Sequence, residues 1–356
     1  MIYGSGGYEP SSIAIADVNG DGKPDLVVSN NCADSTCATD GTVAVLLGNG
    51  DGTFQAAVTY DSGGMETDSV AVADLNGDGK PDLVAANFCS NATNCSNFGP
   101  GSVSVLLGNG DGTFQTAVAY AAGGEAIFIA AEDVNGDGKP DVVIASCAGP
   151  GFGCAPGSVG VLLGNGDGTL QTVVNYPSGG DDPESLSLAD VNGDGKLDAV
   201  VENEFSLSSL HGGSTIGVLL GNGDGTFQTA VAYDIGGVGG EATVADVNGD
   251  GKPDVVVTER AGSCTSSSTV AVLLGNGDGT FQPEVDFCSG GSGYGPSSVA
   301  VDRCERGRRV RRGCGEQFNG RRAHQYRHNG STFSNEPQFR ATGAGDKQFA
   351  TNGHLD

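Results

Sequence analysis

Tryptophan is absent from this 356-residue chain, methionine occurs only 2 times and histidine only 4 times. Positive charge is also scarce, because 17 lysines and arginines stand against 44 aspartates and glutamates, for a formal net charge of −27. A surface of that sign repels phosphate backbones and anionic lipids, so we expect no nucleic-acid partner. No apolar stretch reaches the roughly 20 residues of a membrane-spanning helix, so we also expect no membrane insertion.

The few basic residues are placed unevenly. Residues 1–302 hold 6 of them beside 39 acidic residues, whereas residues 303–356 hold 11 beside 5. The last segment is therefore predicted to be chemically different from the rest of the chain.

The N-terminus shows no apolar core of a signal peptide. Met1-Ile2-Tyr3-Gly4 instead matches Val58-Thr59-Tyr60-Asp61, which lies inside a later repeat. We therefore expect this chain to be part of a larger parent polypeptide, whose location a missing signal peptide does not reveal.

What the chain has in abundance is repetition. The nine-residue string D-[VL]-N-G-D-G-K-[PL]-D occurs five times, beginning at Asp17, Asp74, Asp133, Asp190 and Asp246. The copies begin 57, 59, 57 and 56 residues apart. A steady period near this length is typical of solenoids, propellers and repeat arrays.

Each period contains four short apolar segments separated by Gly, Asn and Asp. In the first period they are Ser12–Ala16, Asp25–Val28, Thr42–Leu47 and Phe54–Tyr60. Their β-branched residues and flanking turn residues predict strands. Four short antiparallel strands per repeat suit the blade of a propeller. The predicted fold class is all-β, a β-propeller of four-stranded antiparallel blades with five full repeats and an incomplete sixth.

The predicted propeller domain covers residues 1–302. Its repeats lie near residues 4–60, 61–120, 121–176, 177–233 and 234–287, and a partial repeat begins at 288.

We name the four strands of a repeat A to D. Alanines such as Ala14 and Ala16 predict that strand A is innermost, where only small side chains fit. Because successive strands alternate in direction, the A–B and C–D connections share one face of the disc. The B–C and D–A connections share the other. The acidic strings are thus predicted on one face and the variable loops on the opposite one, which suits a scaffold with a recognition face.

The acidic string carries side-chain oxygens at positions 1, 3, 5 and 9, with glycines at positions 4 and 6. Calcium takes 6–8 oxygen ligands, and glycine permits the tight wrap with positive φ. We therefore predict about five structural Ca²⁺ sites, in which the lysine at position 7 offers only its backbone carbonyl. The predicted ligands are Asp17, Asn19, Asp21, Lys23 and Asp25; Asp74, Asn76, Asp78, Lys80 and Asp82; Asp133, Asn135, Asp137, Lys139 and Asp141; Asp190, Asn192, Asp194, Lys196 and Asp198; and Asp246, Asn248, Asp250, Lys252 and Asp254.

Other calcium motifs and a second string were compared with this interpretation. An EF-hand needs an acidic residue at position 12, where these strings have Val28, Ala85, Ile144, Val201 and Val257. The second string, G-N-G-D-G-T, recurs around Asp51, Asp111, Asp167, Asp224 and Asp278. A tight turn explains it fully, and a metal role there is the less favoured alternative.

Cysteines recur at corresponding points of the first three repeats. The pairs are Cys32/Cys37, Cys89/Cys95 and Cys147/Cys154, each enclosing a short polar loop. Such placement predicts disulfides and an oxidising compartment, with reduced cysteines or a metal site as the alternative. The spacings differ from CxxC and no histidine accompanies them. Cys264 and Cys288 form a possible fourth pair.

These motifs resemble the FG-GAP repeat, also called VCBS-like. The string is similar to the D-x-[DN]-x-D-G-x-x-D loops of the integrin α-subunit propeller, and the resemblance covers residues 1–302. It implies a propeller with calcium-binding loops, of a kind that bacterial extracellular proteins join to other modules. The literal Phe-Gly and Gly-Ala-Pro signature is degenerate here, with Phe54-Gln55 and Gly63-Gly64 in its place.

The sixth repeat begins normally at Gly295–Val301 and then becomes arginine-rich. Reading 302–328 one nucleotide later with permitted codons restores an acidic string and two strands. We therefore predict that residues 303–356 are a frameshifted, disordered tail, the alternative being a basic arm for an acidic partner.

The predicted function is a calcium-stabilised extracellular module for binding, adhesion or scaffolding, monomeric within its parent polypeptide. Its partner is expected to be a protein or glycan on the variable face. Alternatives are the propeller of a secreted polysaccharide lyase or hydrolase, or a carbohydrate-binding module. We predict no catalytic residues, since His211 lies in a variable loop and only Glu202, Glu204 and Glu259-Arg260 are charges that break the repeat symmetry there.

Overall fold

The computed structural model describes residues 1–37, 40–91, 95, 99–147, 156–205, 213–260, 268–288, 296–299, 301 and 341–343. The named elements in these ranges are all strands, and they form five four-stranded antiparallel sheets with one sheet per repeat. Within the same ranges, no helix has the length and apolar character needed to cross a membrane. The predicted all-β class and four-stranded blades are confirmed.

The strands follow the order A-B-C-D across every sheet. The A strands are β1 (Tyr8–Ala16), β5 (Met65–Ala73), β9 (Glu125–Glu132), β13 (Asp181–Ala189) and β17 (Val238–Ala245). The B strands are β2 (Asp25–Cys32), β6 (Asp82–Cys89), β10 (Asp141–Cys147), β14 (Asp198–Phe205) and β18 (Asp254–Arg260). The C strands are β3 (Thr42–Leu46), β7 (Ser102–Leu106), β11 (Gly157–Leu162), β15 (Thr215–Leu219) and β19 (Ser268–Leu273). The D strands are β4 (Val58–Asp61), β8 (Val118–Ala121), β12 (Val174–Pro177), β16 (Val231–Asp234) and β20 (Val285–Cys288).

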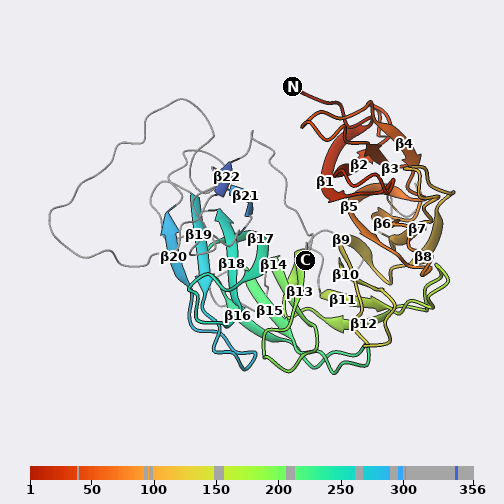
Figure 1. The fold of residues 1–356 in the computed structure, drawn as a ribbon. Helices are drawn as coiled ribbons and strands as arrows, with labels where there is room; N and C mark the ends of the chain where they lie inside the picture. The colour runs from red at the N-terminus through yellow and green to blue at the C-terminus, as the bar shows by residue number, and fades with distance from the viewer. Residues whose placement is uncertain are drawn as a thin grey trace.

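The five sheets are blades that follow one another along an arc (Figure 1). The A strands line the inner side of the arc and the D strands lie on its outer side. Strand A was predicted to be innermost from its alanines, and this is confirmed.

The core lies between consecutive blades. Strands B and C supply most of it, as in β3, where every residue is buried. One cluster joins Val27 and Val45 of the first blade to Leu83 and Leu106 of the second, and similar clusters follow between the later blades. Strand D, by contrast, exposes three of its four residues in the first four blades. Stability therefore depends on contact between neighbouring blades, as expected of repeat proteins.

Strand lengths differ from those predicted. Strands A and B are longer, because their pairing extends to Tyr8 and Cys32 across an irregularity near Pro10. Strand D is shorter, beginning at Val58 instead of Phe54. Phe54 makes only an isolated bridge to Gly48 and packs edge-on against Tyr3.

A sixth unit begins with β21 (Pro296–Val299), which packs on the fifth sheet through Val299, a residue only 3% exposed. Its partner strand is β22 (Ala341–Gly343), the one part of residues 303–356 that the structure describes. These three residues are a paired strand where a disordered tail was expected. The predicted frameshift and the other residues of that segment, including Cys304 and His324, lie outside the described residues.

Candidate metal centres

Each acidic string forms a loop around the backbone N–H at its position 5. In the first blade, Asp21 N donates to Asp17 Oδ1 at 3.1 Å and to Asn19 Oδ1 at 2.9 Å. Gly22 N donates to Asp17 Oδ2 at 2.7 Å. Gly20 and Gly22 have φ angles of 72° and 78°, which confirms the predicted need for glycine. Side-chain oxygens from positions 1 and 3 therefore gather at one point.

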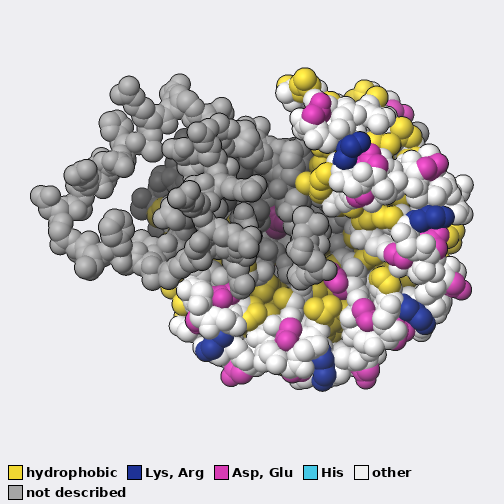
Figure 2. Space-filling model, viewed as in Figure 1, with side chains coloured by type: hydrophobic (Ala, Val, Ile, Leu, Met, Phe, Trp, Pro, Cys, Tyr) yellow, Lys and Arg dark blue, Asp and Glu magenta, His cyan; other side chains and the backbone are white. Residues whose placement is uncertain are grey.

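The lysine at position 7 does more than offer its backbone. Lys23 Nζ lies 3.0 Å from Asp21 Oδ2, and the corresponding lysines of the next three blades make similar ion pairs. Dark blue basic side chains are spaced around the arc in Figure 2, with magenta acidic side chains near them. Exposed ion pairs of this kind contribute only about 0–1 kcal/mol. Each string has one lysine beside three aspartates, so its net charge stays negative.

The aspartate at position 9 is buried and connects two loops. Asp25 is 0% exposed; its Oδ2 accepts from Val18 N at 2.9 Å and its Oδ1 accepts from Gly48 N at 2.7 Å. Val18 belongs to the acidic loop and Gly48 to the G-N-G-D-G turn, so this carboxylate joins the A–B and C–D connections on one face. The predicted sharing of a face is confirmed.

The same clamp occurs in all five blades. The other buried aspartates and their backbone donors are Asp82 with Leu75 and Gly108, Asp141 with Val134 and Gly164, Asp198 with Val191 and Gly221, and Asp254 with Val247 and Gly275. Burial raises the pKa of each clamp carboxyl above its usual range, and the two N–H donors partly offset that effect.

Glycine is required where strand C enters the turn. A Cβ on Gly48 would lie 2.1 Å from Pro24 O, a distance that no real side chain tolerates. The turn itself is closed by its own polar groups, because Asp51 Oδ1 accepts from Thr53 N at 2.9 Å and from Thr53 Oγ1 at 2.6 Å. Turn formation therefore accounts for the second string, as predicted.

The turn of one blade also lies against the acidic loop of the blade before it. Gly168 N donates to Leu75 O at 3.1 Å, and Gly225 N donates to Val134 O at 3.3 Å. The acidic loop is thus held between its own turn and the next one, which fixes its position relative to both blades.

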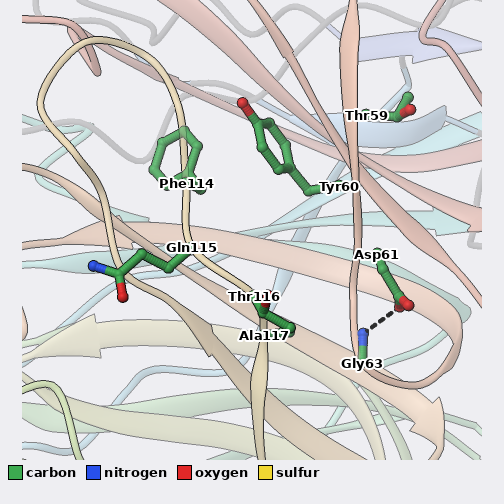
Figure 3. A pocket seen from close by; sticks show the side chains of 8 residues that line it. All are labelled: Thr59, Tyr60, Asp61, Gly63, Phe114, Gln115, Thr116 and Ala117. Atoms are coloured by element: carbon green, nitrogen blue, oxygen red, sulfur yellow. Dashed lines mark hydrogen bonds between the residues drawn. The ribbon is translucent and has the colours of Figure 1, made fainter.

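An aromatic pair supports this contact on the outer side of the arc. Tyr60 of β4 meets Phe114 of the second blade edge-on, with ring centroids 5.5 Å apart and an interplanar angle of 82°. These rings line a surface pocket that also includes Asp61, whose Oδ1 accepts from Gly63 N at 2.8 Å (Figure 3). Equivalent pairs are Tyr3–Phe54, Tyr176–Phe227 and Tyr233–Phe281. The pocket is therefore part of a repeated blade junction.

The loop residues fit calcium in part. Positions 1 and 3 bring a carboxylate and an amide oxygen together at the N–H of position 5, and hard oxygen ligands suit Ca²⁺. Within the described ranges, however, no loop brings oxygens of all three of its carboxylates within 4.8 Å of one another. The structural reason is the clamp, which occupies position 9. A ligand role for Asp25 and its four equivalents stays a prediction.

Two of the predicted disulfides are present, Cys32–Cys37 and Cys89–Cys95, and the prediction is confirmed for these pairs. Cys147 and Cys288 are also disulfide-bonded. Their proposed partners, Cys154 and Cys264, lie outside the described residues. Because Cys32 and Cys89 end strand B, these bridges lie at the start of the B–C loops, on the face opposite the clamps.

Symmetry is broken in the fifth blade. Glu259, recognised in the sequence only as an asymmetric charge, is 0% exposed, and ligand oxygens of Glu259, Glu284 and Asp286 lie within 4.8 Å of one another. Sequence reasoning missed Glu284 and Asp286. The sequence did contain a signal, a charge at a position that is apolar in the other repeats. The residues that correspond to Glu284, directly before strand D, are Ala57, Ala117, Val173 and Ala230.

Two other groups combine a glutamate with a cysteine pair, Glu9 with Cys32/Cys37 and Glu66 with Cys89/Cys95. Both pairs are disulfide-bonded and offer no thiolate, so these groups are not metal centres.

Comparison with known proteins points to one repeat family. A family model of the FG-GAP-like repeat matches residues 31–85, 94–144, 133–201, 206–257 and 246–302, and a model of the FG-GAP repeat matches residues 10–46 and 67–106. Together the matches cover most of the chain. A search of curated proteins found no match.

Solved structures show a similar fold at low sequence identity. A functionally unknown protein from Desulfotomaculum acetoxidans has a TM-score of 0.51 and 18% identity, with 80% of this chain and 71% of that chain covered. The Vibrio cholerae biofilm matrix protein Bap1 has a TM-score of 0.46 and 22% identity. That match covers 84% of this chain but only 45% of Bap1, so this chain spans less than half of its length.

Proposed function

This chain belongs to the FG-GAP repeat family, and from that premise we propose that it is a calcium-stabilised extracellular propeller module that binds or scaffolds other molecules. The observation that carries the proposal is the acidic loop, which keeps the same hydrogen-bond pattern around position 5 in all five blades. A ligand that is required once per blade for structural reasons explains such regularity better than catalysis at a single point.

Charge supports a cation in each loop. Each loop has carboxylates at positions 1 and 5 and an amide oxygen at position 3, and the exposed lysine at position 7 pairs with the position-5 carboxylate in the first four blades. Asp17, Asn19 and Asp21, with their equivalents, would hold the ion, and Ca²⁺ would supply charge neutralisation without any chemical step. At a calcium concentration tenfold above the dissociation constant, each site would add about 1.4 kcal/mol, or roughly 7 kcal/mol over five sites.

The first test is the melting temperature of the full chain in EDTA and in rising CaCl₂. We expect a rise with calcium concentration and a smaller one with MgCl₂, because Mg²⁺ demands a stricter geometry and keeps its waters. A melting temperature that does not respond to calcium would contradict the proposal.

A second test counts ions by native mass spectrometry. Asp21→Asn alters position 5 of the first loop and should remove one bound Ca²⁺. Asp51→Asn is the matched control, since Asp51 is an equally exposed aspartate whose carboxylate serves Thr53. It should leave the count unchanged. Equal counts for both variants and the wild type would exclude the first loop as a site.

Recognition is assigned to the face that carries the B–C and D–A connections. The disulfides at Cys32 and Cys89 hold the bases of two B–C loops and support an oxidising, extracellular setting. Because tryptophan is absent, stacking platforms for sugars are few, so we favour a protein partner over a glycan. A glycan array should show no binding; consistent hits would favour a carbohydrate-binding module instead.

A further inference from the structure

A polar residue near the end of strand B marks the same place in every blade. It is Asn30, Asn87, Ser146, Asn203 or Glu259, each five residues after the clamp aspartate. The place lies between strand B, strand C and the connection from the preceding blade. In the first four blades the residue is neutral and hydrogen-bonds to its neighbours, although Asn30 Oδ1 in the first blade has no partner.

The second blade shows how complete these contacts are. Asn87 Nδ2 donates to Ser102 Oγ at 3.2 Å and to Ser104 Oγ at 3.0 Å, while Asn87 Oδ1 accepts from Thr67 Oγ1 at 2.9 Å. Ser62, in the preceding connection, completes the group, with its Oγ 2.7 Å from Thr67 Oγ1.

The fourth and third blades follow the same plan. Asn203 Oδ1 accepts from Ser178 Oγ at 2.6 Å, and Asn203 Nδ2 donates to Thr215 Oγ1 at 3.3 Å. In the third blade, the hydroxyls of Ser146 and Ser158 lie 2.9 Å apart.

In the fifth blade the equivalent position near the end of strand B is still polar and buried, but the residues that would hydrogen-bond to it are missing. Glu259 replaces the asparagine, and Ile235 stands where Ser62 and Ser178 stand in earlier connections. Neither carboxylate oxygen of Glu259 has a hydrogen-bond partner, and neither does Thr269 Oγ1 on the paired strand, although both residues are 0% exposed. The Gly237 N–H acts on the Glu259 carboxyl and lowers its pKa, but less than burial and the two neighbouring charges raise it.

Two further carboxylates point to the same spot. Glu284 Oε1 accepts from Gly236 N at 2.8 Å, but its Oε2 is buried without a partner, as is Asp286 Oδ1. Glu259, Glu284 and Asp286 each place an oxygen within 4.8 Å of the others. Burial, followed by the charges of Glu284 and Asp286, raises the pKa of Glu259 to about 8. A buried carboxylate group of this kind is costly unless a proton or cation neutralises it.

We propose that Glu259, Glu284, Asp286 and the hydroxyl of Thr269 form a sixth divalent-cation site, of the calcium class, separate from the five acidic loops. Its ligands are all hard oxygens, with no sulfur or imidazole among them, which disfavours zinc. Where the other blades close this place with amide and hydroxyl hydrogen bonds, the fifth blade closes it with a metal ion. That ion would join β18, β19 and β20 at the connection from the fourth blade.

The test compares the full-length wild type with Glu259→Gln after EDTA treatment and dialysis into CaCl₂. Native mass spectrometry should show one Ca²⁺ fewer on the variant. Glu66→Gln is the matched control, an exposed glutamate on β5, and should keep the wild-type count. If Glu259→Gln fails to fold, Asp286→Asn, at a partly exposed position, provides the same comparison.

Melting temperatures give an independent test, because the difference between variant and wild type should change sign when calcium is added. In EDTA, Glu259→Gln should melt at a higher temperature than the wild type, because folding of the wild type must either bury a charge near two others or take up a proton. In saturating CaCl₂ the order should reverse. Equal ion counts, together with an equal calcium response, would show that protons alone neutralise the group and would overturn the proposal.

The ion counts of two variants distinguish this site from the acidic loops. A wild type that binds one Ca²⁺, lost in Glu259→Gln but kept in Asp21→Asn, would support this site while rejecting the loop sites. The opposite pattern, with the ion lost in Asp21→Asn and kept in Glu259→Gln, would reject this site alone.

Discussion

At the scale of single residues, the clamp aspartate should matter more for folding than for metal binding. Asp141 accepts from Val134 N and Gly164 N, so Asp141→Ala leaves two buried donors without an acceptor. We expect the free energy of unfolding to fall by about 2–6 kcal/mol, since each such donor costs about 1–3 kcal/mol. Asp167→Ala, at an exposed turn position, should cost about 1 kcal/mol or less. Urea denaturation in EDTA measures both.

The same experiment decides between two roles of position 9. A loss seen in EDTA supports the clamp, whereas a loss confined to calcium-containing buffer would make Asp141 a metal ligand first. The sequence spacing placed all the carboxylates in one motif but could not separate them. The donor Gly164 lies 23 residues after Asp141, so the second contact of the clamp depends on blade geometry, which the nine-residue string does not contain.

Asp68, on the innermost strand β5, should make stability depend on pH. Burial, with the charges of Glu66 and Glu184 next, raises its pKa from 3.8 to about 7. The folded state therefore binds more protons than the unfolded chain between about pH 4 and 7, so this contribution to stability is complete below about pH 4 and is lost as the pH rises to about 7. Asp68→Asn should match the wild type at low pH and exceed its melting temperature at pH 8. A difference that stays constant with pH would contradict this.

At the scale of elements, the aromatic pair at each blade junction should contribute through its size more than its ring. Tyr176 meets Phe227 with ring centroids 5.9 Å apart, and Phe227 is only 6% exposed. Phe227→Leu should cost about 1 kcal/mol, because the third blade already uses Leu170 at this position, while Phe227→Ala should cost about 3–5 kcal/mol. Denaturant titration gives both values. Equal losses in the two variants would show that the ring contact itself is essential.

The existence and order of the strands could be predicted from the sequence, but their lengths could not. Turn residues and β-branched runs mark four strands per repeat, and the structure has four. Strand D is shorter than its apolar pattern because Phe54 leaves the ladder and packs edge-on against Tyr3. Strand A is longer because Tyr8 pairs with Cys32 beyond an irregularity that no local pattern signals.

At the scale of the whole molecule, the regular repeat made the fold easy to predict. It also made the carboxylate cluster of the fifth blade, which departs from the repeat, hard to notice. A period of nearly constant length identifies blades, because only a recurring unit repeats its loops and core positions together. The cluster around Glu259 breaks that rule through three substitutions in separate strands and connections, each unremarkable alone. Only the packing of β18, β20 and the connection at Ile235 shows that they meet.

The net charge of −27 leads to a final prediction. Lysines of the first four loops pair with loop carboxylates at the surface, and the acidic residues far outnumber the basic ones, so most of the acidic charge is opposed only by solvent ions or by bound calcium. In EDTA, raising NaCl from low to moderate concentration should therefore raise the melting temperature, because salt screens the repulsion between loops. In saturating CaCl₂ the same change should have a smaller effect, since the ions have already neutralised that charge. A salt response of equal size in both buffers, measured by differential scanning calorimetry, would mean that calcium does not neutralise the acidic loops.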